Sequence, residues 1–287
     1  GGPVSFGAMG DAYFEYLLKM WVMGAGQRPV QRFYRMWETA VIGMAERLLR
    51  STKGPSKHIY LGTSEGDTMD HLACFAPGML ALGAWKAKAA GGKPDPLIMG
   101  YAEGLMETCY QMYSSSPTGV AGENYRFTSG GGAGGGAEME LEDPRAVLRS
   151  EVAESLFYLF RITRNLRYRN MGWKIFQALE RQTRVDGGGY SGLRDVEEKV
   201  AAGRDNMDDR MEGHWLGGTL KYLYLLFASP DLVPLDTWVF NTQAHPLRVV
   251  RAEERADIPW AGLAGEALEA FTDLDTPEVW SGDGDGE

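Results

Sequence analysis

Arg149-Ser-Glu-Val-Ala-Glu-Ser-Leu-Phe-Tyr-Leu-Phe-Arg-Ile-Thr163 is the stretch that decides the fold class. Val152, Leu156 and Leu159 recur in it on one helical stripe, which is typical of an amphipathic helix packed on a core. The same period predicts further helices, clearest over 11–23, 28–50 and 211–227 and also expected over 70–90, 94–113, 168–183 and 260–271. Short extended pieces are expected near residues 58–61 and 187–191. Because no strand–helix–strand rhythm occurs, the sequence predicts an all-α fold, an α/α toroid or solenoid.

The composition is that of a globular protein. The chain has 287 residues, of which 44% are hydrophobic and 24% charged, enough for one large domain or two modest ones. Eight Trp, 13 Tyr and 11 Phe exclude a disordered or collagen-like chain. No apolar run approaches the roughly 20 residues of a membrane helix. Since the sequence opens on Gly-Gly-Pro without a signal core, we expect any targeting or anchor segment to lie outside it.

The net charge of −10 belongs to one end of the chain. Residues 253–287 carry 11 acidic residues against one basic residue, so the rest of the chain is neutral. This divides the sequence into a domain over 1–250 and an acidic tail over 251–287. Basic patches interleaved with aromatic residues are missing, which argues against nucleic-acid binding. The Gly-rich segment 129–137 predicts a loop inserted between helical stretches, because it lacks the features of a phosphate loop.

Carboxylates at two predicted helix starts are the candidates for chemistry. Glu151 and Glu154 are three residues apart, so they share one helix face, and Arg149 precedes them. Facing a cavity, this group could perform acid–base work or bind hydroxyls. The same residues could instead serve the helix dipole on a solvated surface. Asp11 directly follows Gly10 and has the same two readings, a functional carboxylate or a helix cap.

The histidines, serines and cysteines are less informative. The histidines lack the spacing of a zinc site and the serines lack a nucleophile elbow. Cys74 and Cys109 are the only cysteines, and their number is compatible with two buried thiols or with one disulfide.

Gly10-Asp-Ala-Tyr-Phe-Glu-Tyr-Leu-Leu-Lys19 resembles the Gly-Asp-Ser-Tyr-Tyr-Glu-Tyr-Leu-Leu-Lys signature of class I α-1,2-mannosidases, the family 47 glycoside hydrolases. The stretch quoted at the outset also resembles this family. Further matching words follow in the family's order: His71-Leu-Ala-Cys-Phe75, Pro117-Thr-Gly-Val-Ala-Gly-Glu123, Gly172-Trp-Lys-Ile-Phe-Gln-Ala178, Gly188-Gly-Tyr-Ser191, Thr219-Leu-Lys-Tyr-Leu-Tyr-Leu-Leu-Phe227 and Phe240-Asn-Thr-Gln-Ala-His-Pro246. The resemblance implies an (α/α)₇ barrel, here incomplete at the N-terminal side, with short β-hairpins in loops.

The resemblance also implies an activity and a set of site residues. The family cleaves terminal α-1,2-linked mannose from high-mannose N-glycans with inversion, using an acid and a base on opposite sides of the sugar. An alternative is a lectin-like member or fragment that binds mannose glycans without cleaving them. By matching position, the implied roles are catalytic carboxylate for Asp11, general base for Glu151, sugar binding for Arg149, Glu154, Glu123 and His71, Ca²⁺ binding for Thr242, and a disulfide for Cys74 with Cys109.

Several positions depart from the family pattern. Gly218 and Gln243 stand where the family has glutamates, which should weaken the water shell of Ca²⁺. His214 replaces an aromatic residue of the sugar site, and Ser150 replaces a proline. Met9 stands where endoplasmic-reticulum members carry an arginine, so we expect weak branch discrimination of the Golgi type.

The implied setting is the secretory lumen, Golgi or endoplasmic reticulum, because the disulfide needs an oxidising compartment. A monomer acting on glycoprotein glycans is expected. About the first third of the family's barrel has no counterpart here, so these 287 residues alone are expected to hydrolyse mannosides poorly.

Overall fold

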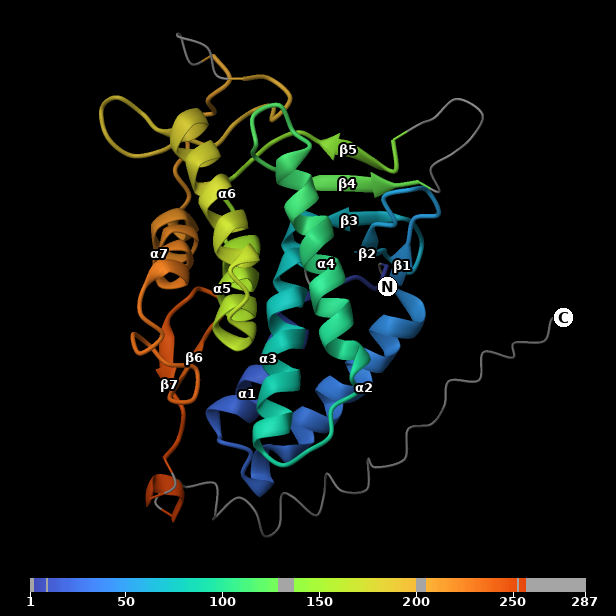
Figure 1. The fold of residues 1–287 in the computed structure, drawn as a ribbon, viewed down its shortest axis with the longest axis vertical. Coiled ribbons are helices and arrows are strands. Elements are labelled where there is room, and N and C mark those ends of the chain that lie inside the picture. Colours follow the sequence, from blue (N-terminus) through green and yellow to red (C-terminus); the bar gives the residue numbers. More distant parts are fainter. Residues whose placement is uncertain (1–2, 9, 129–136, 200–204, 252, 257–287) are drawn as a thin grey trace, which may run out of the picture.

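Helices packed side by side form the body of the molecule, and three small sheets lie in their connections (Figure 1). The computed structural model describes residues 3–8, 10–128, 137–199, 205–251 and 253–256. The helices are α1 (Asp11–Met23), α2 (Gln31–Arg47), α3 (Ala76–Ala89), α4 (Leu97–Ser114), α5 (Glu151–Thr163), α6 (Arg167–Thr183) and α7 (Lys221–Phe227). The strands are β1 (Leu49–Ser51), β2 (Ile59–Leu61), β3 (Thr68–Asp70), β4 (Asn124–Phe127), β5 (Met139–Asp143), β6 (Trp238–Phe240) and β7 (Pro246–Arg248). Among these described helices, none has the length and apolar character needed to cross a membrane.

The quoted stretch forms the central helix, as the sequence predicts. Val152, Leu156 and Leu159 of α5 are all buried. Gly78 of α3 lets the two helices approach closely, because a Cβ there would stand 2.9 Å from the Cα of Ser155. The hydroxyl of Ser155 fills this contact, accepting a hydrogen bond of 2.9 Å from the amide of Gly78. The helix that carries Glu151 is therefore held in the middle of the core.

Two predicted helices are shorter than expected. The helix predicted over 28–50 begins with a 3₁₀ turn at Arg28–Val30, where Pro29 fixes the backbone, and ends at Arg47. Leu49 to Ser51 instead form β1, because they pair antiparallel with β2. The prediction over 70–90 was also too long: it contains the last residue of β3 and a 3₁₀ turn at His71–Phe75 before α3 begins.

The region 211–227 departs in a different way. It holds a π-helix at Trp215–Leu220 that leads directly into α7. Pairs of glycines lower the cost of such irregular turns, and Gly217 and Gly218 lie within this one. The helix thus exists, but its first part is wider than an α-helix.

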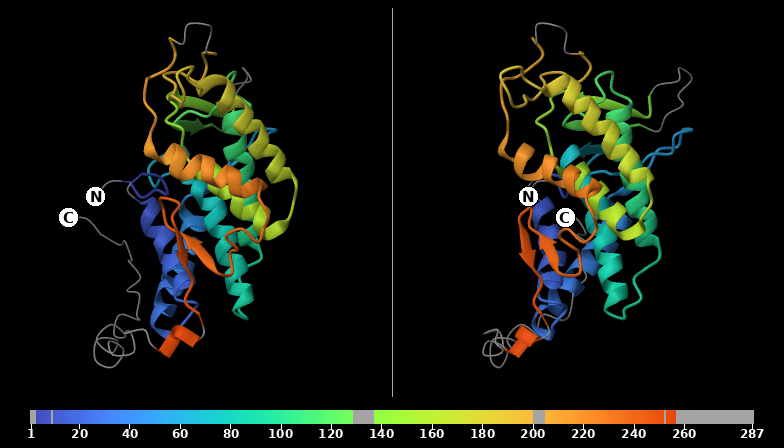
Figure 2. Two further views of the ribbon diagram at one scale, coloured as in Figure 1. Left: turned by 90° about the vertical axis from the view of Figure 1, so that its left-hand side faces the viewer. Right: turned by 60° about the vertical axis from the view of Figure 1, so that its left-hand side comes forward.

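The strands form three small antiparallel sheets. β3, β4 and β5 make a sheet at one end of the long helices (Figure 1), with Thr68 opposite Arg126 and Tyr125 opposite Leu141. β6 and β7 form a hairpin that lies beside α1 in the side views (Figure 2). Short hairpins in the loops are confirmed. The Gly-rich segment lies between β4 and β5, two strands that the sequence does not predict, and this pair of strands lies between α4 and α5.

A disulfide joins Cys74 in the 3₁₀ turn to Cys109 in α4, with 5.9 Å between the Cα atoms. The two cysteines are separated by 35 positions in the sequence. The disulfide that the resemblance implies is confirmed.

Several expectations concern residues outside the described part of the chain. These are the helix over 260–271, most of the acidic tail, Met9 and residues 129–136 of the Gly-rich loop. The division into a domain over 1–250 and a tail stays a prediction.

Candidate active site

Glu151 is the first residue of α5, directly after Ser150. Its side chain is 17% exposed, and its Oε2 atom has no hydrogen-bond partner among the described residues. Burial raises the pKa of this carboxyl group to about 7, against the opposing charge of Arg149. A carboxyl group that exchanges its proton near neutral pH is suited to general acid–base work.

His71 faces Glu151 from the 3₁₀ turn that follows β3. The imidazole is 2% exposed, and its Nε2 atom shares a hydrogen bond of 2.9 Å with the hydroxyl of Tyr113 in α4. Its Nδ1 atom lies 4.0 Å from Oε2 of Glu151, too far for a direct hydrogen bond. Burial, and to a lesser degree the charge of Arg149, lower the pKa of His71 to about 3, so the ring is neutral. Both facing atoms can therefore bind a third polar group.

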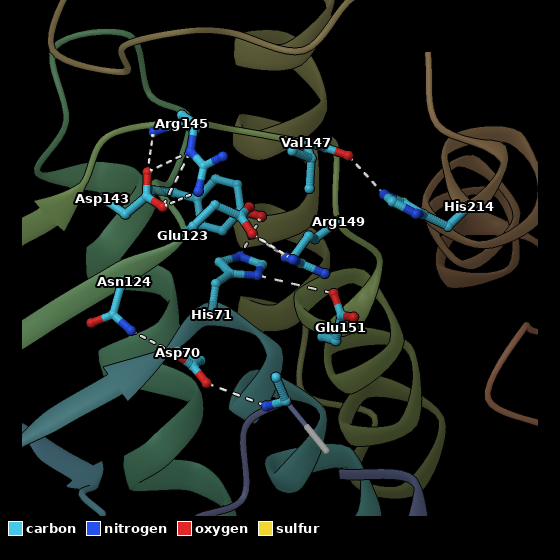
Figure 3. A network of polar contacts seen from close by, with 12 residues as sticks. Asp70, His71, Glu123, Asn124, Asp143, Arg145, Val147, Arg149, Glu151 and His214 are labelled. Atoms are coloured by element: carbon cyan, nitrogen blue, oxygen red, sulfur yellow. Dashed lines mark hydrogen bonds and ion pairs between the residues drawn. The ribbon is translucent and has the colours of Figure 1, made fainter. Parts of the chain in front are cut away.

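Arg149 and Glu123 form an ion pair beside this carboxyl group (Figure 3). Nε and Nη2 of Arg149 lie 2.6 Å and 2.5 Å from Oε2 of Glu123. The carbonyl of Glu123 accepts a hydrogen bond of 2.9 Å from the amide of His71, which ties the segment before β4 to the 3₁₀ turn. His71, Glu123 and the Arg149–Glu151 segment come from three separate parts of the sequence, yet Figure 3 shows their side chains converging. His71, Glu123 and Arg149 thus form a charged, hydrogen-bonding wall beside Glu151. Such a wall suits a ligand rich in hydroxyls.

Asp11 is the first residue of α1. Gly10 occupies the cap position, and no side chain caps the helix, so the structure does not use Asp11 as a cap. The turn before α1 is nonetheless close to the site. The amide of Ala8 donates a hydrogen bond of 3.2 Å to Oδ2 of Asp70, the neighbour of His71.

Glu154 belongs to a separate, more deeply buried cluster. Its Oε1 atom lies 2.9 Å from Nζ of Lys19 in α1, which also pairs with Glu15 on the same helix. Burial raises the pKa of Glu154, while the ammonium group of Lys19 opposes that rise. The structure thus separates Glu154 from the Arg149–Glu123 pair, although the four-residue motif carries both Glu151 and Glu154 on one helix.

Thr242 follows β6 and is exposed next to α1, where its amide lies 3.4 Å from the hydroxyl of Tyr16. Within the described residues, neither its hydroxyl nor its carbonyl oxygen has a hydrogen-bond partner, so both hard oxygens fit a calcium ion. The neighbouring Gln243 adds only neutral donors. The described part of the chain contains no cluster of three His, Cys, Asp or Glu side chains able to hold a metal ion. The donor set therefore fits a weakly held, largely hydrated ion.

Two of the departures from the family pattern, His214 and Gly218, pack against the segment that leads into Glu151. His214 donates from Nε2 to the carbonyl of Val147 over 2.7 Å. Gly218 lies against Ser150, since a Cβ on this glycine would stand 2.8 Å from the Cβ of the serine. The π-helix therefore supports the approach to α5 directly.

Two residues of these networks were not singled out from the sequence. Tyr113 orients His71, and Lys19 joins Glu15 to Glu154. The spacing of Glu15 and Lys19, four positions on one helix, is a signal that could have shown their pairing. No spacing could have shown the partner on α5.

Comparison with known proteins settles the family. Residues 2–249 match the model of glycosyl hydrolase family 47. A mannosyl-oligosaccharide 1,2-alpha-mannosidase, MNS1 of Arabidopsis thaliana, is 45% identical over 250 residues, covering 86% of this chain and 41% of the relative. The chain belongs to glycosyl hydrolase family 47.

Other members of the family agree. The endoplasmic reticulum mannosyl-oligosaccharide 1,2-alpha-mannosidase of Homo sapiens is 40% identical over 254 residues, covering 86% of this chain and 35% of that protein. The alpha-1,2-mannosidase from Trichoderma reesei superposes with a TM-score of 0.74 at 24% identity, covering 87% of this chain and 53% of the other. This likeness confirms the α/α barrel, of which the described helices form a part. The chain spans about two-fifths of the length of the relatives that it matches.

Proposed function

We propose that this chain forms part of the catalytic domain of an α-1,2-mannosidase that removes terminal α-1,2-linked mannose from high-mannose N-glycans with inversion. The observation that carries the proposal is Glu151, a buried carboxyl group with a pKa of about 7 beside a neutral imidazole and an arginine–glutamate pair. The names of the relatives support the substrate class. The lectin-like alternative is not favoured, because the relatives are described as mannosidases.

In this proposal each side chain has a chemical task. Glu151, once ionised, accepts a proton from the water that attacks the anomeric carbon. His71 and Arg149 donate hydrogen bonds to sugar hydroxyls, and Glu123 both accepts from the sugar and holds Arg149 in place. Because the base must be ionised, activity should rise with pH through about 7.

Protonation of the leaving oxygen needs a second carboxyl group, roughly 6.5–9.5 Å from the base in inverting enzymes. We assign Asp11 as a further catalytic carboxylate of the pocket. Glu154 has a structural task in this proposal, because its ion pair with Lys19 holds α5 against α1. The relatives are longer than the matched part, and we expect the general acid to come from a region that this chain does not match.

Glycan binding tests the pocket without relying on catalysis. We expect titration calorimetry to detect binding of a nine-mannose glycan, and Arg149→Met to weaken it about 10- to 100-fold through loss of charge-assisted hydrogen bonds. Arg126→Met is the matched control, because Arg126 forms an exposed ion pair with Glu142 on the same sheet. Equal weakening by both variants, or no binding by the wild type, would contradict the proposal.

Hydrolysis is tested by mass spectrometry of the same glycan, with the first-formed anomer identified by NMR. We expect slow release from these 287 residues, inversion of configuration and loss of release in Glu151→Gln. Retention of configuration, or release that persists in the variant, would show that Glu151 is not the base.

We further propose that Ca²⁺ binds through the hydroxyl and carbonyl oxygens of Thr242, where it would anchor sugar hydroxyls. The neutral Gly218 and Gln243 predict weak affinity. The test is the shift in melting temperature caused by millimolar Ca²⁺, measured for the wild type and for Thr242→Ala. A shift that survives the substitution would place the ion elsewhere.

The cellular setting is also a proposal. The Cys74–Cys109 disulfide supports residence in the lumen of the Golgi or endoplasmic reticulum, where thiols are oxidised. We propose that the protein acts there as a monomer, which sedimentation analysis of the purified protein tests.

A further inference from the structure

Lys19 is buried between carboxylates of two different helices. Lys19, Glu15 and Glu154 are each at most 7% exposed. The ammonium group pairs with Glu15 on its own helix α1 and with Glu154 on α5, 2.9 Å away. The ring of Tyr158, also on α5, lies 5.8 Å from Nζ. Lys19 is therefore the ionic link between α1 and α5.

The link lies close to the two candidate catalytic carboxylates. Asp11 and Glu15 are four positions apart on α1, and Glu151 and Glu154 are three positions apart on α5, so each pair shares a helix face. Lys19 joins the second member of each pair. Asp11 and Glu151 each lie about one turn nearer the start of their helix.

Stability alone does not account for such a cluster. Burying two carboxyl groups and one ammonium group costs more than burying well-packed apolar side chains of similar size. Burial would lower the pKa of Lys19, but the neighbouring carboxylates raise it well above its ordinary value, so the lysine stays charged. A costly charged link between two rigid helices suits a positional role.

We propose that Lys19 is a positioning residue for the proposed hydrolysis: by tying α1 to α5 through Glu15 and Glu154, it fixes the distance between the carboxylates of Asp11 and Glu151. The inference rests on the proposed function for its catalytic consequence only. The geometric consequence, a fixed spacing of two helix starts, stands independently of any activity.

The test compares Lys19→Met with the conservative Lys19→Arg and with a matched control. Arg161→Met is that control, because Arg161 is also a buried cation, but it lies near the end of α5 and donates hydrogen bonds to the carbonyls of Leu225, Pro230 and Leu232. Crystal structures report the distance between the carboxylate carbons of Asp11 and Glu151. We expect this distance to change by about 1 Å in Lys19→Met, which suffices for a loss of up to about 100-fold in rate. We expect no change in Lys19→Arg or Arg161→Met.

Kinetics in the longest active form of the enzyme give the second readout. We expect kcat of Lys19→Met to fall about 10- to 100-fold while KM changes less than about twofold, because the sugar-binding wall is untouched. Arginine should restore most of kcat, and Arg161→Met should lower the melting temperature without lowering kcat. If Lys19→Met does not fold, Lys19→Met/Glu15→Gln takes its place, because it removes one carboxylate together with the ammonium group that balances it.

The outcomes separate the two proposals. An unchanged carboxylate distance together with unchanged kcat in folded Lys19→Met would overturn the positioning role. A changed distance in Lys19→Met, together with a wild type that neither binds nor cleaves mannosides, would support the positioning role and overturn the proposed function.

Discussion

Replacing Glu151 with glutamine should change how the stability of the protein depends on pH. Burial raises the pKa of this carboxyl group from an ordinary 4.5 to about 7, so the folded state binds its proton more tightly than the unfolded state. The stabilisation from this proton is fully present below about pH 4.5 and is lost as the pH rises through about 7.

The size of the effect follows from the same two values. At about 1.4 kcal/mol for each tenfold change in proton affinity, the rise corresponds to about 3 kcal/mol, most of which is lost between pH 5 and pH 8. Glu151→Gln cannot ionise. Its free energy of unfolding, relative to that of the wild type, should therefore increase by about 2 to 3 kcal/mol over this interval.

Urea denaturation of both proteins at pH 5, 6, 7 and 8 measures this difference, and all other titrating groups cancel in the comparison. Glu140→Gln is the matched control, because Glu140 is an exposed glutamate of β5. We expect a flat difference for the control. The same slope in both variants, or a Glu151→Gln difference below about 0.5 kcal/mol, would refute the reasoning.

The remaining predictions concern the disulfide, the π-helix and the arginine of the site. Replacing Cys74 and Cys109 with alanine should lower the free energy of unfolding by about 4 kcal/mol, since the bond closes a loop over 35 positions, and denaturation with and without reductant measures it. Gly218→Ala should cost about 1–3 kcal/mol by overpacking, because its Cβ would meet Ser150 at 2.8 Å, and adding Ser150→Gly should restore most of that loss in a double-mutant cycle. Arg149→Lys should keep the fold but weaken glycan binding about tenfold in calorimetry, because an ammonium group cannot reproduce the fork of the guanidinium group.

Local periodicity predicted the helices well where neighbours along the chain decide the structure. The helix over 11–23 was placed with its observed ends, between Gly10 and Gly24. The helix predicted over 28–50 was too long, because Leu49 to Ser51 pair with β2, and a pairing partner in another segment has no local signature. The same reason hid the sheet of β3, β4 and β5, whose strands have three to five residues.

In the candidate site too, the sequence identified individual residues but not the contacts between residues that are far apart in the chain. Motif resemblance named Glu151 and His71 but could not show that their facing atoms are 4.0 Å apart. It also could not separate Glu154 from the Arg149 network. The sequence distance of 135 positions between Lys19 and Glu154 explains why that link emerges only from the folded chain.

The disulfide affects when, during maturation of the chain, the imidazole of His71 takes its fixed orientation. Cys74 follows His71 by three positions and Cys109 precedes Tyr113 by four. The disulfide therefore joins the same two elements, the 3₁₀ turn and α4, as the hydrogen bond that orients the imidazole. A chain still carrying free thiols would leave the 3₁₀ turn and α4 joined by packing alone, and the ring would lose its fixed orientation before the fold as a whole is lost. If the proposed function holds, the pocket would reach its final geometry only after the two thiols have been oxidised, so glycan binding would depend on the redox state of the chain.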